Sequence, residues 1–135
     1  MALTVSHSHE DQDLDLICEF ILSAYWSKGR SADRIRRAVA ASCVVGIFEN
    51  GRQIGFARAF SDMALVAYVM DVFIVEDARG RGLGVRIMCE LLAHPDLRDV
   101  PVWRLTTEDA QGLYQNLGFE VAENGTAMRL DRSAV

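Results

Sequence analysis

Apolar residues recur along the chain with two different periods, and the change of period separates expected helices from expected strands. A spacing of three to four residues predicts amphipathic helices over 11–26, from Ser31 onward, over 83–93 and over 109–118. Runs of β-branched and aromatic residues predict strands over 43–48, 54–60, 65–75, 102–107, 119–123 and 126–130, with a short first strand at 3–6. Asn50-Gly51 and Asn124-Gly125 are the expected hairpin turns.

The expected order of elements is β-α-α-β-β-β-α-β-α-β-β, in a single domain over residues 1–135. The strand over 65–75, the helix over 83–93 and the strand over 102–107 require a right-handed crossover between parallel strands. The other neighbouring strands form hairpins. We therefore predict an α/β fold of the α+β kind, with a mixed, mostly antiparallel central sheet of about six to seven strands and helices on both faces.

Composition and charge exclude some classes of protein. Half of the residues are apolar, 24% are charged, and the net charge is −5, so we expect a globular protein without bulk affinity for nucleic acid or for an anionic membrane. No apolar run approaches the length of a membrane span, and the first residues lack the pattern of a secretory signal. We expect a cytoplasmic protein.

The cysteines and histidines do not predict a metal site. Cys18, Cys43 and Cys89 are odd in number and fit no metal-ligand spacing, so we expect buried free thiols in a reducing compartment. The histidines, which fall in expected loops or near the first residue, are interpreted as surface residues; they are His7, His9 and His94.

The stretch VEDARGRGLGVRIM joins the expected central strand to the next helix, a place where glycine-rich turns bind phosphate. It fails the dinucleotide pattern G-x-G-x-x-G, because Val85 stands where the third glycine is required. It fails the nucleoside-triphosphate pattern, because Val85 and Arg86 follow Gly84 in place of Lys and Ser or Thr. It does fit R-x-x-G-x-G, through Arg79, Gly82 and Gly84.

A second motif strengthens this fit. DAQGLYQNLGFE contains A-x-x-x-Y-x-x-x-G-F, formed by Ala110, Tyr114, Gly118 and Phe119. At this spacing the two motifs together resemble the GNAT superfamily of N-acetyltransferases, and the resemblance covers nearly the whole chain. The chain is most similar in kind to small single-domain bacterial members of unassigned substrate. The resemblance implies acetyl-CoA as co-substrate and no metal.

The resemblance also implies which residues hold acetyl-CoA. The glycine turn would bind the pyrophosphate, and the end of the central strand would pair its backbone with the pantetheine arm. The residues implied are Phe73, Ile74, Val75, Arg79, Gly80, Arg81, Gly82, Leu83, Gly84 and Val85. Thr107 stands where the family often has Asn, and its hydroxyl is the expected contact there, while Asp109 is expected to cap the last helix.

For the chemistry, the resemblance implies Tyr114 as the general acid that protonates the leaving thiolate. Asp71 and Glu108 are alternative candidates for a general base, either directly or through water. Backbone N–H groups at Phe73 or its neighbours could stabilise the developing oxyanion.

The acceptor is expected to be a primary amine of a small molecule or peptide. Tyr25, Trp26 and Tyr68 are candidates for its pocket, although Tyr25 and Trp26 could equally complete the apolar face of the first helix. The chain could be a monomer or a homodimer.

The leading hypothesis is therefore an acetyl-CoA-dependent N-acetyltransferase that works by direct attack in a ternary complex. The alternative is a non-catalytic acyl-CoA-binding sensor or regulatory module of the same fold. A third hypothesis, an RGG-like nucleic-acid contact, is opposed by the acidic net charge and the absence of repeated RGG units.

Overall fold

The computed structural model describes residues 3–24, 29–107, 109–121 and 126–132. Its strands are β1 (Leu3–Ser6), β2 (Cys43–Glu49), β3 (Arg52–Ser61), β4 (Val66–Ile74), β5 (Val102–Thr106), β6 (Glu120–Val121) and β7 (Ala127–Asp131). Its α-helices are α1 (Leu14–Ser23), α2 (Ala32–Ala40), α3 (Leu83–Leu92) and α4 (Gln111–Gln115), and single 3-10 turns lie at His9–Asp11 and Glu76–Ala78. The predicted order of helices and strands is confirmed.

The strands form one seven-stranded sheet in the order β1-β2-β3-β4-β5-β7-β6. Among the described strands only β4 and β5 are parallel, and every other neighbouring pair is antiparallel. The expected mixed, mostly antiparallel sheet is therefore confirmed, with its one parallel pair at the crossover through α3.

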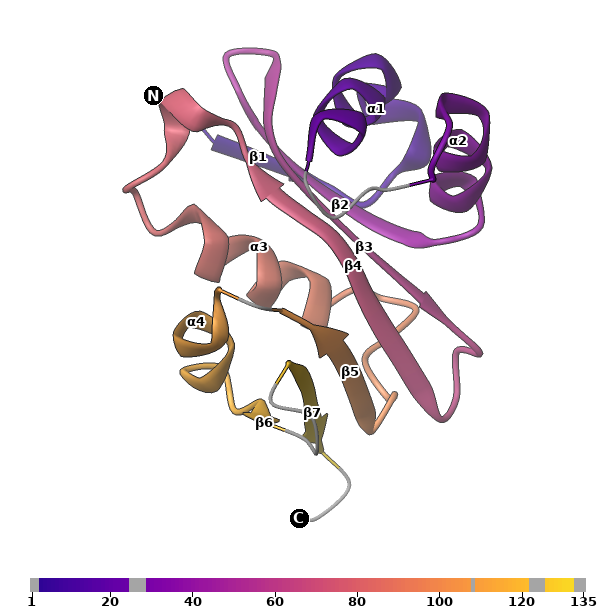
Figure 1. Ribbon diagram of the computed structural model, residues 1–135, viewed down its shortest axis with the longest axis vertical. Helices are drawn as coiled ribbons and strands as arrows, with labels where there is room; N and C mark the ends of the chain where they lie inside the picture. The colour runs from indigo at the N-terminus through magenta and orange to yellow at the C-terminus, as the bar shows by residue number, and fades with distance from the viewer. Residues whose placement is uncertain (1–2, 25–28, 108, 122–125, 133–135) are drawn as a thin grey trace.

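Helices cover both faces of this sheet, as predicted. Figure 1 shows α1 and α2 on one side of β2–β4 and α3 on the other. Neighbouring residues of a strand point to opposite faces, and β4 shows this directly. The Phe73 ring stacks on Phe20 of α1, with 3.9 Å between ring centroids. The next residue, Ile74, lies with Ile87 of α3 beside Gly55 on the opposite face.

The helix boundaries differ from the periodic pattern. α1 begins after Asp13, whose carboxylate accepts the backbone N–H of Leu16, so it is shorter than the predicted 11–26. Ser31 caps α2 as predicted, through a hydrogen bond from the Arg34 N–H. α4 covers only five residues, fewer than the predicted 109–118. The apolar period predicts a helix there but does not show where the helix begins and ends. No described helix has the length and hydrophobicity of a membrane span.

Two turns follow the local sequence closely. Asn50 and Gly51 both have positive φ, 53° and 80°, as the two-residue hairpin between β2 and β3 requires. Gly118, with φ of 97°, ends the segment that follows α4. The Asn124-Gly125 turn lies outside the described residues, but the strands on either side of it pair antiparallel as predicted.

Burial corrects two of the sequence-based interpretations. Cys18 and Cys43 are buried free thiols, as expected, whereas Cys89 is exposed on α3. His94 is buried, although it was interpreted as a surface residue. It follows the last turn of α3, and its ring packs edge-on against His7, with 4.8 Å between ring centroids, a tertiary contact that local polarity does not reveal.

Candidate active site

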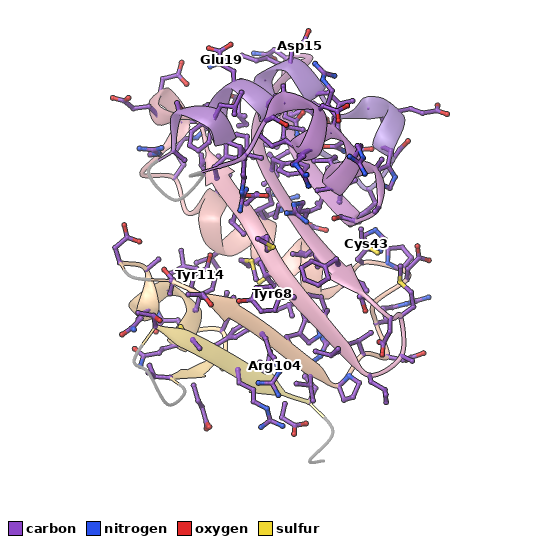
Figure 2. All side chains as sticks on the ribbon, turned by 45° about the vertical axis from the view of Figure 1, so that its right-hand side comes forward. Asp15, Glu19, Cys43, Tyr68, Arg104 and Tyr114 are labelled. Atoms are coloured by element: carbon purple, nitrogen blue, oxygen red, sulfur yellow. The ribbon has the colours of Figure 1, made fainter. Side chains whose placement is uncertain are left out.

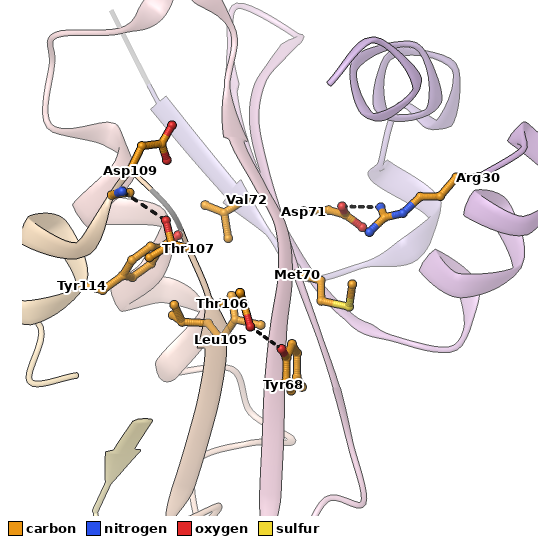
Figure 3. Close-up of a pocket in the computed structure, with 12 residues that line it drawn as sticks. Arg30, Tyr68, Met70, Asp71, Val72, Leu105, Thr106, Thr107, Asp109 and Tyr114 are labelled. Carbon is orange, nitrogen blue, oxygen red and sulfur yellow. Dashed lines mark hydrogen bonds and ion pairs between the residues drawn. The ribbon is translucent and has the colours of Figure 1, made fainter. Parts of the chain in front are cut away.

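The sheet opens between its two parallel strands. β4 and β5 pair only over 66–68 and 102–104, and among the described residues no further pairing joins them. Beyond this point a cavity of about 490 Å³ separates the strands (Figure 3). The residues that line it are Arg30, Tyr68, Val69, Met70, Asp71, Val72, Leu105, Thr106, Thr107, Asp109, Ala110 and Tyr114.

At the closed end of the opening, a hydrogen bond links the two strands. The hydroxyl groups of Tyr68 and Thr106 lie 2.8 Å apart. The Tyr68 ring also stacks on Phe60 of β3, which fixes its direction. Tyr68 therefore lines the cavity, as the sequence predicts for an acceptor-pocket residue, but its hydroxyl already has a partner.

A β-bulge interrupts β4 in the middle of the cavity wall. Phe56 pairs with Phe73 and Arg58 with Met70, so two residues of β4, at 71 and 72, face a single residue of β3. Asp71 carries the distortion, with a φ of 56°. Asp tolerates this left-handed conformation better than most residues. The bulge changes the direction of the β4 backbone where the strands part.

Asp71 is held by two arginines. One carboxylate oxygen accepts from Arg30, at 2.6 Å, and the other accepts from Nε of Arg58, at 2.8 Å. The Asp71 side chain is only 2% exposed, and Figure 3 shows it directed away from Tyr114, toward Arg30. Both oxygens are thus occupied by charged donors. This corrects the expectation of a general base, because the geometry assigns Asp71 to holding the bulge.

Sequence reasoning missed this ion cluster, although a signal was present. Asp71 stands alone in the apolar run LVAYVMDVFIV, and Arg58 stands alone in IGFARAF. A buried charge needs an opposite charge close by, and these two strands were already expected to be neighbours. The ion pair between Asp71 and Arg58 could have been inferred from that.

The backbone of β4 offers hydrogen-bonding groups to the cavity at alternate residues. The Val75 N–H donates to the Ile54 carbonyl of β3, and the Val75 carbonyl accepts from Ala78. Because strand backbone groups alternate in direction, Phe73 also faces β3, while Val72 and Ile74 face the gap. Of the three expected pairing residues, Ile74 therefore faces the gap, whereas Phe73 and Val75 face β3; Val72 is a gap-facing residue that the sequence did not single out.

The glycine turn leaves an open surface at the start of α3. Gly80 and Gly82 have φ of 82° and 74°, and a Cβ added to either would meet nothing within 4 Å. Gly82 is the N-terminal cap of α3 and provides no side-chain hydrogen bond. The N–H groups of the first helical residues, Leu83, Gly84 and Val85, therefore lack partners within the helix and carry its positive dipole end.

Gly84 has a different role from the one expected. A Cβ there would lie 3.1 Å from the Leu113 side chain of α4. Gly84 thus allows α3 and α4 to approach closely. Its N–H can still serve an anion, but its missing side chain serves the packing of the two helices.

The three arginines of this stretch all contact protein groups. Arg81 forms two hydrogen bonds with the Glu49 carboxylate and lowers the pKa of that group. Arg86 pairs with Glu90 one helical turn later. Arg79 donates through Nε to the Ile74 carbonyl at 3.0 Å, so this carbonyl, at one of the two gap-facing residues, already has a partner.

Tyr114 projects from α4 into the wall of the cavity. It is 9% exposed, and among the described residues no hydrogen-bond partner is found for its hydroxyl. Burial, and then the nearby Asp109 carboxylate, raise the pKa of Tyr114 to about 12. The phenol is therefore protonated throughout the physiological range and is free to donate into the cavity.

Thr107 rather than Asp109 supports the start of α4. Its hydroxyl accepts the backbone N–H of Ala110 at 3.1 Å, so the predicted cap by Asp109 is wrong. Thr107 does line the cavity, and its hydroxyl proton remains available for a ligand. The other predicted site residues, Tyr25, Trp26 and Glu108, lie outside the described residues.

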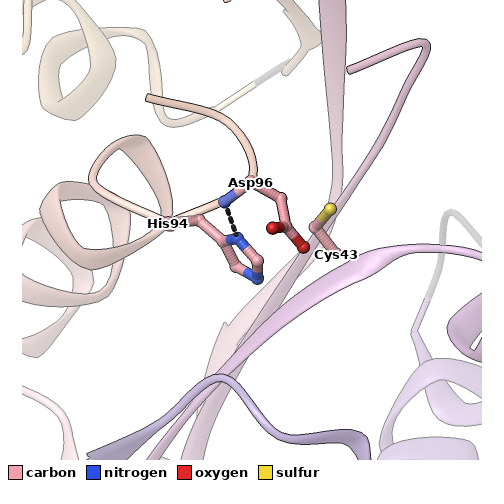
Figure 4. A group of neighbouring side chains, drawn as sticks. All are labelled: Cys43, His94 and Asp96. Carbon is pink, nitrogen blue, oxygen red and sulfur yellow. Dashed lines mark hydrogen bonds between the residues drawn. The ribbon is translucent and has the colours of Figure 1, made fainter. Parts of the chain in front are cut away.

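A second group of side chains lies away from the cavity. Cys43, His94 and Asp96 bring possible metal-ligand atoms within 4.8 Å of one another (Figure 4). In Figure 2, Cys43 and Tyr114 lie on opposite sides of β4. Nδ1 of His94 already accepts the Asp96 N–H at 3.1 Å, and burial lowers the pKa of His94. The expectation that the protein holds no metal stays a prediction.

The fold and this opening define a class of protein. An open, mostly antiparallel sheet that splits at one parallel pair, next to a glycine turn and helix N-terminus, is the architecture of GNAT acetyltransferases. A family model for the GNAT acetyltransferase domain matches residues 40–121. The chain belongs to this family.

Individual relatives agree with the assignment. A Xanthomonas campestris pv. campestris protein described as a GNAT-family acetyltransferase is 37% identical, with a TM-score of 0.83 over 89% of this chain and 85% of that one. An uncharacterized N-acetyltransferase, ycf52, from Gracilaria tenuistipitata var. liui is 29% identical over 84% of this chain. The match spans 63% of the length of that relative.

Solved structures of lower identity share the fold. The ribosomal-protein-S18-alanine N-acetyltransferase of Escherichia coli has a TM-score of 0.80 at 20% identity, covering 99% of this chain and 96% of that one. A GNAT-family acetyltransferase from Elizabethkingia anophelis, with acetyl-CoA bound, has a TM-score of 0.74 at 14% identity over 96% of this chain and 97% of that one.

Proposed function

We propose that this protein transfers the acetyl group of acetyl-CoA to a primary amine of a small molecule or peptide, by direct attack in a ternary complex. The observation that carries the proposal is the edge of β4 at Val72 and Ile74, which no described strand pairs, leading to the open glycine turn. An extended amide-bearing arm can add to such an edge as a further strand. A pyrophosphate at the end of that arm would then meet the N-terminus of α3.

The glycine turn fits this part of the ligand in shape and charge. Gly80 and Gly82 leave space on the solvent side, and the free N–H groups that begin α3 favour an anion. Arg79 and Arg81 stand on either side of Gly80, and each can exchange its protein partner for a phosphate oxygen bound at the turn. The salt bridge from Arg81 to Glu49 is partly exposed, so losing it costs little.

The cavity wall supplies the groups that acetyl transfer needs. As the amine nitrogen bonds to the acetyl carbon, the carbon–sulfur bond breaks, the thiolate gains a proton, and the nitrogen loses one. Tyr114 is positioned to donate to the departing sulfur. The gap-facing N–H of Val72, next to the bulge, is the proposed donor to the acetyl oxygen. The amine's proton leaves to water, and Glu108 stays a candidate for relaying it.

The experiment that tests this function measures free thiol and N-acetylated product together. Purified protein with acetyl-CoA is offered a panel of amines and peptides, and thiol release is compared with product mass. We expect equal amounts of thiol and acetylated amine with at least one acceptor, and a lower turnover for Tyr114→Phe. Binding of acetyl-CoA with no turnover on any acceptor would favour the non-catalytic sensor.

A further inference from the structure

The Asp71 bulge borders a second hollow, on the face of the sheet that α2 covers. This hollow has a volume of about 270 Å³. It is lined by Arg30, Arg34, Ile35, Ala38, Arg58, Met70 and Asp71. Arg30, Met70 and Asp71 also line the cavity between β4 and β5, so the two spaces adjoin at these residues.

The charge of this hollow is unbalanced. Three guanidinium groups face a single carboxylate, that of Asp71. No acid of α1 or α2 lines the hollow: Asp15 pairs with Arg36 at 2.6 Å, Asp33 pairs with Arg37 at 3.7 Å, and Glu19 is exposed. Among the described residues, the hollow therefore has an excess of two positive charges, in a protein whose net charge is −5.

The three arginines differ in how many donors they have left. Each nitrogen of Arg58 has a partner: they donate to Asp71, to the Ser42 hydroxyl and to the Met70 sulfur. Arg30 uses one nitrogen on Asp71 and is about a quarter exposed. Arg34 has no side-chain partner among the described residues. Arg30 and Arg34 thus present unused donors at the rim of the hollow.

Resting on the proposed function, we infer that this hollow is the acceptor's anion subsite and that the acceptor is an amine bearing a carboxylate. Arginine's planar fork matches the two oxygens of a carboxylate. Arg30 and Arg34 bind the carboxylate, and Asp71, held by Arg58, fixes Arg30 in place. The amine of the same molecule then extends past the bulge into the cavity, toward Val72.

The test compares amines that differ only in this charge. Glycine, β-alanine and γ-aminobutyrate are each assayed beside the corresponding primary amide, by thiol release with acetyl-CoA. We expect the best carboxylate to exceed its amide in kcat/KM by at least tenfold. This preference would run against intrinsic reactivity, because the amine of an α-amino amide is the weaker base and a larger fraction of it is neutral.

Variants assign the preference to residues. Arg34→Gln should raise KM for the carboxylate about tenfold more than KM for the amide, and Arg34→Glu should reverse the preference. Arg37→Gln is the matched control, since Arg37 lies on the same helix and faces Asp33 instead of the hollow. Equal loss in Arg37→Gln and Arg34→Gln would contradict the subsite.

The failures of the two proposals are distinguishable. Thiol release at equal rates from carboxylates and amides overturns the subsite but leaves the acetyltransferase standing. Faster reaction of phosphoethanolamine than of all carboxylates replaces the carboxylate with a phosphate. If no amine reacts, calorimetry of N-acetylglycine with the CoA-bound protein still decides: binding that Arg34→Glu abolishes supports the subsite, and absence of binding overturns it.

Discussion

Replacing Tyr114 with Phe removes one hydroxyl from the cavity wall and leaves the ring in place. The size of the effect follows from the acidity of the group. A phenol with a pKa of about 12 faces a thiolate whose conjugate acid has an ordinary pKa near 8.5. Complete proton transfer would be uphill by about 5 kcal/mol, so Tyr114 acts mainly by donating a strong hydrogen bond to the developing thiolate.

A hydrogen bond to a charged group contributes roughly 1.5–3 kcal/mol. Tyr114→Phe should therefore lower kcat roughly 10- to 150-fold, which is less than the loss of a fully matched general acid. Affinity for acetyl-CoA should change little, because the ring still fills its place. Steady-state thiol release and calorimetry measure the two quantities separately.

The pH dependence gives a second check on the same residue. Because Tyr114 keeps its proton up to about pH 12, the ratio of wild-type to Tyr114→Phe rates should be constant from pH 7 to 10. A ratio near one, or a wild-type decline between pH 7 and 9 that Tyr114→Phe abolishes, would refute the assigned role.

Three further predictions concern stability and the co-substrate. Gly82→Ala and Gly51→Ala both place a side chain at positive φ in open space, and each should lower the free energy of thermal unfolding by roughly 1–2 kcal/mol. Only Gly82→Ala should weaken acetyl-CoA binding, by at least tenfold in calorimetry. Equal affinity of Gly82→Ala and the wild type would contradict the pyrophosphate assignment. Asp71→Asn leaves the buried guanidinium of Arg58 without its anion and should lower the free energy of unfolding in urea by about 3–5 kcal/mol. A loss below about 1 kcal/mol would contradict a stabilising role for the ion pair between Asp71 and Arg58. The unfolded chain releases the Tyr114 proton near pH 10 and the folded chain near 12. The free energy of unfolding should therefore fall by about 3 kcal/mol as pH rises across that interval. In Tyr114→Phe this part of the fall in stability should be missing.

Local patterns predicted the elements of this fold well, and for physical reasons. Asn50-Gly51 strongly favours a turn with two positive φ values, and the nearly continuous apolar run of β4 is typical of a strand covered on both faces. The glycine turn was recognisable because Gly80 and Gly82 need conformations that other residues avoid. Each of these features is set within a few residues of chain.

Features that depend on distant strands were not predictable in this way. The bulge at Asp71 arises from its register with β3 and from Arg30 and Arg58, so its place cannot be deduced from β4 alone. The same register decides that Val72 and Ile74, rather than Phe73 and Val75, face the gap. His94 is buried for a similar reason, since its ring packs against His7, which is distant in the sequence.

The central claim is that acetyl-CoA adds to the open edge of β4, and amide hydrogen exchange tests it most directly. With saturating acetyl-CoA, exchange at Val72 and Ile74 should slow markedly, because their N–H groups gain partners. Exchange at Phe73 and Val75 should stay slow with or without the ligand, because their N–H groups already face β3. Saturated binding that leaves Val72 and Ile74 unchanged would contradict the claim.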